Sequence, residues 1–336
     1  MQVWELTAWS RDGLRRAERP EPTPGPGQIV VGIEAASLNY RDLVMVNGGY
    51  GRAGGDLPVV PLSDGAGRIV AVGDGVDPSL AGELVVPSFF QHWRSGRFPP
   101  DALTGALGGP LDGVLQERML LDAGGVVAAP KGWSAAEAST LPCAAITAWG
   151  AVAVLARTRP GDVVVVEGTG GVACFAVQFA HLCGAHVVVV SSSDAKLEAV
   201  QRLGADTLIN YRRTPQWGKA VRAAVREADL VVELGGADTL GQALRAVRPG
   251  GTIALIGVLS GGMAELPLGP AVTREIRFQS VTCGSRDDLR DMVRAIDAST
   301  IRPMIDRTYP FAALPDALDR LEAAEHIGKI CVNGAA

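Results

Sequence analysis

Residues 163–180, VVVVEGTGGVACFAVQFA, contain the turn that decides the fold. Consecutive valines make a run apolar enough for a strand buried on both faces, and a glycine-rich turn separates it from a helix-like apolar stripe. A turn without Cβ atoms lets phosphate oxygens approach the backbone, where the next helix presents unpaired N–H groups and the positive end of its dipole. The spacing Gly168-x-Gly170-x-x-Ala173 therefore predicts a dinucleotide site, with Ala173 where helix and strand pack closely.

The chain that follows this turn repeats the same alternation. From about residue 135, apolar runs alternate with helix-period segments at 195–203, 215–227 and 238–247. The runs are DVVVVE, HVVVV, TLIN, DLVVEL and TIALIGV. This pattern predicts parallel strands with right-handed crossovers, a doubly wound α/β sheet. No G-x-x-x-x-G-K-[ST] motif occurs, so a nucleoside triphosphate is the poorer ligand.

The chain before this region has a different texture. Residues 1–127 contain short apolar runs punctuated by Gly and Pro, such as GRIVAVGDGV and AGELVVPSFF, which predict strands joined by tight turns. After about residue 299 we expect an extended piece, a helix in LPDALDRLEAA and a last strand in GKICVN. With 336 residues, 47% hydrophobic and 20% charged, the chain can build two domains with proper cores.

Composition narrows the possible partners and location. The net charge is −5 and charges are interspersed, so we expect no nucleic-acid partner. The first ten residues include Glu5 and no apolar core, and the apolar window 170–190 changes period halfway, which favours a helix followed by a strand over a membrane span. We therefore expect a cytoplasmic protein without a membrane partner. The cysteines, at 143, 174, 183, 283 and 331, form no C-x-x-C pair and indicate reduced, mostly buried thiols.

The segment SSSDAKLEAV, after the second strand of the alternating region, bears on the choice of nicotinamide cofactor. An NAD site usually has an acidic residue at this strand tip. Here Ser191, Ser192 and Ser193 supply hydroxyls and Lys196 a cation, which suit a 2′-phosphate. Asp194 opposes this inference because a carboxylate would repel phosphate; it could instead cap the next helix, with Ser193 as the competing cap. We expect NADP(H).

Motifs along the whole chain carry a family resemblance: ASLNYRDLVMVNGGY, PLSDGAGRIVAVGDGV, STLPCAAITAWGAV, GTGGVACFAVQFA and RPGGTIALIGVLSG. With these the chain resembles the medium-chain dehydrogenase/reductase superfamily, in its zinc-free, alcohol-dehydrogenase-like and quinone-oxidoreductase-like branch. The resemblance implies an α/β protein with a GroES-like β-rich catalytic domain, residues 1–127 and 299–336, and a doubly wound Rossmann NADP-binding domain, residues 128–298. It implies NADP-dependent oxidoreduction, although substrates differ widely within the branch.

The resemblance also implies which residues bind the cofactor. Ser191, Ser192, Lys196 and Tyr211 match positions that hold the adenosine phosphate, and Lys329 matches one near the pyrophosphate. Two turns, 234–236 and 257–259, line the nicotinamide side. The full expected set is Thr147, Gly168, Thr169, Gly170, Gly171, Val172, Ser191, Ser192, Lys196, Tyr211, Leu234, Gly235, Gly236, Gly257, Val258, Leu259 and Lys329.

The zinc ligands of the superfamily are not matched. Zinc-containing members have a Cys, a His-Glu pair and a second Cys at the places that here read Asn39-Tyr40, Ser63-Asp64 and Cys143, and their four-cysteine lobe is missing. One thiol and one carboxylate are fewer than the three donors that a catalytic zinc needs. His92 could in principle join them, although a histidine beside aromatic residues is more often a pocket wall. We expect no metal.

Without a metal, side chains must polarise the substrate oxygen or supply a proton. Asn39 can donate an N–H to a carbonyl oxygen and Tyr40 can donate a proton. Tyr50 matches the tyrosine that 2-enoyl thioester reductases of the superfamily use as proton donor; alternatively it only caps a loop. Arg41 and Asp42 are expected to form an ion pair that orients the loop. Phe89, Phe90, His92 and Trp93 are expected to form an apolar substrate wall.

Two classes of function stay open. The first is a zinc-independent, NADPH-dependent oxidoreductase that transfers hydride to a carbonyl or an activated C=C of a small-molecule substrate, such as a quinone, enone, aldehyde or ketone. The second is a non-catalytic NADPH-binding sensor or structural protein of the same fold. The apolar run GGTIALIGVLSGG has few charges to protect an exposed sheet edge, so we expect it to pair in a homodimer.

Overall fold

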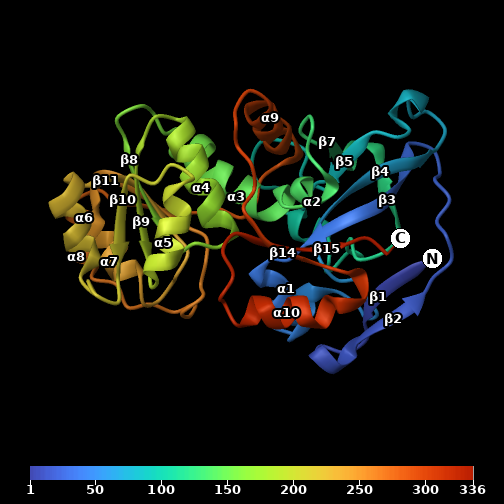
Figure 1. Ribbon diagram of the computed structural model, residues 1–336, viewed down its shortest axis with the longest axis horizontal. Coiled ribbons are helices and arrows are strands. Elements are labelled where there is room, and N and C mark those ends of the chain that lie inside the picture. The colour runs from blue at the N-terminus through green and yellow to red at the C-terminus, as the bar shows by residue number, and fades with distance from the viewer. Residues whose placement is uncertain (336) are drawn as a thin grey trace. The chain divides into compact units, whose positions relative to one another are not determined.

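The computed structural model describes residues 1–335, apart from the side chain of Arg52. The chain forms two compact units, which we call the β-rich unit and the α/β unit (Figure 1). The β-rich unit contains Met1–Ile146 and the chain from Cys283 onward, and the α/β unit is Thr147–Thr282.

The α/β unit is built on a parallel sheet, which confirms the doubly wound fold. The strands are β8 (Val163–Glu167), β9 (His186–Ser191), β10 (Thr207–Asn210), β11 (Ala228–Glu233), β12 (Val247–Leu255) and β13 (Arg277–Ser280). Their order is β10-β9-β8-β11-β12-β13, and every neighbouring pair is parallel. The chain order reverses at β8, so the turn after this strand lies at the topological switch point, where ligands of such sheets bind.

Helices cover both faces of this sheet. Figure 1 shows α4 (Gly171–Leu182) and α5 (Asp194–Gln201) on one face, with α6 (Trp217–Val225), α7 (Leu240–Ala246) and α8 (Leu268–Thr273) on the other. Apart from Val163, the valines of β8 and β9 are buried between these layers, as expected for strands covered on both faces. The apolar window 170–190 is α4 followed by β9, as its change of period predicted.

The β-rich unit contains a seven-stranded sheet and a separate hairpin. The sheet path is β14 (Ile305–Tyr309), β15 (Lys329–Asn333), β3 (Gln28–Ser37), β4 (Asp64–Val72), β5 (Leu84–Pro87) and β7 (Val126–Ala128), and β6 (Arg118–Asp122) also pairs with β3. β1 (Gln2–Leu6) and β2 (Leu14–Glu18) form the hairpin. The last strand, β15, lies between β14 and β3, so the C-terminal strand pairs with a strand from the first 40 residues of the chain (Figure 1).

The helices of the β-rich unit set the division of the chain. They are α1 (Tyr40–Val46), α2 (Ala135–Ala138), α9 (Arg286–Asp297) and α10 (Leu314–Glu322). We expected divisions after residue 127 and before residue 299, whereas the chain divides at 146/147 and 282/283. The difference arises because α2 packs on β3 and β4, and α9 packs on β7.

A chain of short helical segments continues after α2: η6 (Leu141–Ala145), α3 (Ile146–Trp149) and η7 (Gly150–Leu155). The whole stretch Ala135–Leu155 is long and apolar enough to span a membrane by length and composition alone. However, 67% of its apolar window is buried inside the protein, as in the core helix of a globular fold.

One expectation about the sheet edge was wrong. The run GGTIALIGVLSGG supplies β12, which is paired on both sides, to β11 and to β13. The edge strand on this side of the sheet is β13, a short strand that sequence patterning did not distinguish. Any edge-to-edge pairing of two copies through this side of the sheet would therefore use β13.

Candidate active site

A buried lysine lies at the centre of a polar network in the β-rich unit. Lys329 begins β15, and Asn39 lies directly opposite it, because Cys331 pairs with Ser37 in the antiparallel register of β15 and β3. The Lys329 ammonium donates to Asn39 Oδ1 at 2.5 Å and to the Leu38 carbonyl at 2.6 Å. Only 2% of the residue is exposed. The structure therefore places Lys329 in this network rather than in an open position for the pyrophosphate.

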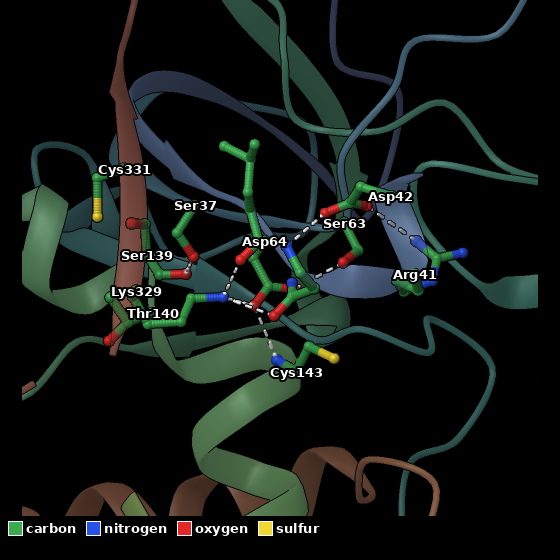
Figure 2. A network of polar contacts seen from close by, with 12 residues as sticks. Ser37, Arg41, Asp42, Ser63, Asp64, Ser139, Thr140, Cys143, Lys329 and Cys331 are labelled. Carbon is green, nitrogen blue, oxygen red and sulfur yellow. Dashed lines mark hydrogen bonds and ion pairs between the residues drawn. The ribbon is translucent and has the colours of Figure 1, made fainter. Parts of the chain in front are cut away.

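Asp64, fully buried at the start of β4, is the anion of the network (Figure 2). It pairs with Ser37 in the register of β3 and β4, and its Oδ2 lies 3.9 Å from Lys329 Nζ. Ser63 donates to Asp64 Oδ1 at 2.7 Å, and the Cys143 backbone N–H donates to Oδ2 at 3.0 Å. Burial raises the pKa of Asp64, although Lys329 and Ser63 act in the opposite direction.

The start of α1 adds an amide and a second carboxylate. Asp42 accepts from the Asn39 backbone N–H at 2.7 Å, which fixes the first turn of the helix. Burial raises the pKa of Asp42 to about 6, against the lowering effect of Arg41. Asn39 is 9% exposed, and its Nδ2 has no hydrogen-bond partner among the described residues. A buried donor without a full hydrogen bond costs about 1–3 kcal/mol, which makes this amide a candidate donor to a ligand, although it also helps to lower the pKa of Asp64.

Arg41 connects this network to the aromatic side chains. The expected ion pair with Asp42 is present, at 3.6 Å, and the guanidinium also donates to the Leu107 and Gly109 carbonyls. It lies 5.8 Å from the ring centroid of Tyr50 and 4.8 Å from that of Phe89. Burial raises the pKa of Tyr50, and Arg41 opposes that effect, so the phenol is protonated at neutral pH and can act as a donor.

Cys143 carries the remaining reactive group. Its Sγ lies 3.8 Å from that of Cys283, and the contact with this thiol and burial raise the pKa of Cys143 well above its ordinary value. All five cysteines are free thiols, in agreement with their spacing. Among residues 1–335, no group of three or more His, Cys, Asp or Glu side chains could hold a metal ion.

The structure does not bring every expected residue to this network. Tyr40 is 50% exposed and lines a separate cavity of about 310 Å³ with Leu43, Val44, Asn47, Gly49 and Glu322. Phe90 and Trp93 pack with Phe98 in an aromatic cluster. His92 is exposed and contacts Thr104 at 3.3 Å, so it does not join Cys143 and Asp64. Of the expected aromatic wall, only Phe89 reaches Arg41.

The phosphate turn in the α/β unit fits its expected ligand. Gly168 has φ +79°, a conformation that favours glycine, and Gly170 is the N-cap of α4 without a side-chain cap. A Cβ built at either glycine meets nothing within 4 Å, so space lies open beside the turn. NADP(H) would be held there by the backbone of 168–172, a turn that includes the buried Thr169; Thr147, earlier in the chain, is buried as well.

The tip of β9 settles the alternatives for Asp194. Ser193 is the cap of α5, since its Oγ accepts from the Lys196 backbone N–H. The Asp194 carboxylate instead accepts from Asn210 at 2.8 Å and pairs with Arg213. Arg213, which sequence analysis did not single out, thus offsets the charge that argued against a 2′-phosphate. Tyr211 is 41% exposed on the segment between these partners.

Two further residues were missed, Glu167 and Glu233. Glu167 ends β8 and accepts from the Leu234 and Gly235 N–H groups, both at 3.1 Å. Glu233 ends β11 and accepts from the Gly235 and Gly236 N–H groups at 3.0 and 2.9 Å. Both are buried, and burial together with the neighbouring Glu233 raises the pKa of Glu167 well above its ordinary value.

The two glutamates hold the 234–236 turn, which was expected on the nicotinamide side. In the second expected turn, Gly257 packs against Leu234, whereas Val258 and Leu259 are exposed. The sequence did contain a signal for these residues, because each of the two apolar runs that form β8 and β11 ends in a glutamate.

Comparison with known proteins agrees with this architecture. Residues 25–131 match the family model "Alcohol dehydrogenase GroES-like domain", and residues 171–298 match "Zinc-binding dehydrogenase". A "Zinc-type alcohol dehydrogenase-like protein" of Schizosaccharomyces pombe is 41% identical over 95% of this chain and 94% of its own length. The chain therefore belongs to the medium-chain dehydrogenase/reductase superfamily, as its motifs indicated.

Two solved structures place it further among dehydrogenases. A structure described as an NAD-dependent alcohol dehydrogenase is 30% identical, with a TM-score of 0.90 over 99% of both chains. A crotonyl-CoA carboxylase/reductase, AntE, in complex with NADP is 25% identical, with a TM-score of 0.88 over 100% of this chain and 95% of that one. The protein is an oxidoreductase of the alcohol dehydrogenase type, with a nucleotide-binding dehydrogenase fold.

Proposed function

We propose that the protein is a zinc-independent, NADPH-dependent reductase that transfers hydride to a carbonyl or an activated C=C. The observation that carries the proposal is the buried Lys329 ammonium between Asn39 and Asp64. Asn39 and Asp64 stand where zinc-containing relatives have a ligand and the acidic residue of a His-Glu pair. A side-chain cation therefore occupies a place that suits a metal's charge, while the donor set is too small for zinc.

The proposed chemistry uses groups of the β-rich unit. NADPH, when bound, supplies the hydride. Negative charge then develops on the substrate oxygen, which the free Asn39 Nδ2 can stabilise as a hydrogen-bond donor. Tyr50, protonated beside Arg41, is the phenol that can donate the proton to the substrate. Tyr40 is the poorer candidate for the acid because it lines the cavity beside Glu322 and not the network around Lys329.

Several features of the α/β unit support NADPH over NADH. Ser191, Ser192 and Lys196 supply hydroxyls and a cation at the tip of β9, and Arg213 offsets Asp194. The NADP complex of AntE supports the same choice, whereas the NAD-dependent relative keeps NADH as the alternative to be tested.

Turnover with a small panel of quinones, enones and aldehydes tests the activity. We expect NADPH oxidation with at least one of these classes, unchanged after exhaustive treatment with a zinc chelator. Elemental analysis should find well below one zinc per chain. No turnover with any of them would favour the non-catalytic NADPH-binding alternative, and a stoichiometric, activity-linked metal would overturn zinc independence.

Cofactor choice is tested separately by fluorescence titration. Lys196→Ala should weaken NADPH binding by about 1–3 kcal/mol, roughly 5- to 150-fold in Kd, and leave NADH binding nearly unchanged. Lys219→Ala, on the exposed side of α6, is the matched control. Equal affinities of the unaltered protein for the two cofactors would contradict the assignment.

We also propose that the protein is a cytoplasmic homodimer. The edge strand β13 is open for pairing, and the chain around it has exposed apolar side chains: Val258, Leu259, Met263, Leu268 and Val272. Met263 is 92% exposed. A monomeric mass in light scattering at micromolar concentration would contradict the dimer.

A further inference from the structure

The contact between Lys329 and Asn39 determines which end of the amide faces a ligand. A side-chain amide has an acceptor oxygen and a donor NH₂ group, and an ammonium is a donor only. Because Lys329 Nζ lies 2.5 Å from Asn39, only the oxygen of the amide can face it. The NH₂ group must then point away from the lysine, and it has no partner among the described residues.

The ammonium has two further neighbours, the Leu38 carbonyl and the Asp64 carboxylate. The Leu38 carbonyl accepts a second Lys329 proton at 2.6 Å. Asp64 lies farther away, at 3.9 Å, and its oxygens are engaged by the Ser63 hydroxyl and the Cys143 backbone N–H. Asp64 therefore balances the buried charge without drawing the lysine away from Asn39 (Figure 2).

The neighbouring charges of α1 do not reach the amide either. Asp42 is engaged with the Asn39 backbone N–H and with Arg41, and Arg41 donates to the Leu107 and Gly109 carbonyls. The Asn39 oxygen accepts from the ammonium, and the amide also helps to lower the pKa of Asp64, although Nδ2 makes no hydrogen bond of ordinary geometry among the described residues.

A charge-assisted hydrogen bond to the oxygen withdraws electron density from the amide and makes its N–H groups stronger donors, most of all in a low-dielectric site. We propose that Lys329 is a positioning residue that orients and polarises the Asn39 amide, so that Nδ2 stabilises the oxyanion of the substrate as a metal would. This inference rests on the proposed reductase function, and it adds a role for a lysine that does not itself touch the substrate.

The first test compares Lys329→Met with Lys131→Met, an exposed lysine of the same unit. Lys329→Met should lower kcat about 10²-fold, the range for loss of an oxyanion donor, with KM for NADPH within about threefold. Asn39→Asp keeps an acceptor for the ammonium but removes the donor, and should lower kcat to a similar extent. The double variant should be no slower than the slower single variant, because both changes remove one interaction.

A second variant separates polarisation from charge balance. Lys329→Met leaves Asp64 buried without its cation, whereas Asp64→Asn/Lys329→Met removes both charges and should regain thermal stability. If Lys329 acts through Asn39, kcat of the double variant stays low although the protein is stable. Recovery of kcat would show that Lys329 only neutralises Asp64 and would overturn the proposal.

The last measurement does not depend on turnover. The Asn39 side-chain NH₂ signals, identified by their loss in Asn39→Asp, are followed in ¹H–¹⁵N spectra of the whole chain. They should move in Asp64→Asn/Lys329→Met and stay in place in Lys131→Met; unchanged signals would overturn the inference. If the unaltered protein reduces nothing in the panel, the proposed function fails, while these signals still decide whether the lysine polarises the amide.

Discussion

Both units bury carboxylates next to backbone N–H donors, but they compensate the charge in opposite ways. In the β-rich unit, Asp64 has a cation, Lys329, at 3.9 Å. In the α/β unit, Glu167 has another carboxyl group, Glu233, as its neighbour. Burial, the charge of Glu233 and its hydrogen bond to Glu167 raise the pKa of Glu167, and the last two effects are expected when two carboxyl groups share a proton.

This difference teaches what each cluster can do. The two glutamates accept hydrogen bonds from the backbone of the 234–236 turn, so their role is to fix the conformation of this loop. The strands of the β-rich unit instead hold a full positive charge in a fixed place and leave one amide donor without a full hydrogen bond among the described residues. Only the second arrangement can stabilise a charge that develops on a ligand.

The largest expected effect is that of Asp64→Ala. It leaves the Lys329 ammonium buried without its anion, which should lower the free energy of unfolding by about 3–5 kcal/mol. Urea unfolding of the variant measures this loss. Glu34→Ala, which removes an exposed partner of Arg68, should cost at most about 1 kcal/mol. Equal effects of the two changes would mean that Asp64 and Lys329 behave as a surface pair.

Glu167→Gln should change how stability depends on pH. The pKa of Glu167 is raised well above its ordinary value of 4.5. Between the ordinary and the raised pKa, the folded state therefore holds a proton that the unfolded state has released. Stability of the unaltered protein should therefore fall as pH rises through that window, by up to about 1.4 kcal/mol per pH unit. The variant should lack this component, and Glu198→Gln, an exposed change, should retain it. A variant with the original slope would refute the shared proton.

Asp42→Asn should have a smaller effect of the same sign in a narrower window. The pKa of Asp42 is raised from 3.8 to about 6, so the folded state binds the extra proton between these two values. Stability should fall as pH rises from about 4 to 6 and then stay level, and the variant should lose this step. Thermal melts across this range measure it, with Asp74→Asn as the exposed control. The effect is smaller because Arg41 compensates part of the charge.

The smallest expected effect concerns thiol reactivity. The raised pKa of Cys143 keeps it protonated at pH 7.5, so iodoacetamide should alkylate it more slowly than Cys183, whose pKa is raised less. Peptide mapping by mass spectrometry follows both residues, which are both half-buried. Alkylation of Cys143 ahead of Cys183 would contradict the electrostatic description of the β-rich site.

Much of the fold could be predicted because its strongest signals are local. Valine runs and the glycine turn defined β8, β9 and α4, and the family motifs defined the two units. The short strand β13 and the unit boundaries could not be read from local pattern, since they depend on which distant element a segment packs against.

The residues of the candidate site likewise fall into those marked by a local motif and those that depend on distant contacts. Asn39 and the phosphate turn were predicted, because each is marked by a motif. The roles of Lys329, Arg213 and the two glutamates come from contacts across many residues, such as the pairing of Lys329 with Asn39. Tyr40 and His92 were expected at the site from their neighbours in the chain, but their side chains face other surroundings.

The position of β15 has a consequence for how the protein is made. A ribosome releases the N-terminal strands first, then the whole of residues 147–282, and only at the end the strand that fits between β14 and β3. The α/β unit can thus complete its folding before the last strand of the other sheet, β15, has been synthesised. Because Lys329 opens that strand, a chain cut short or clipped before it lacks the closing strand and the buried cation together.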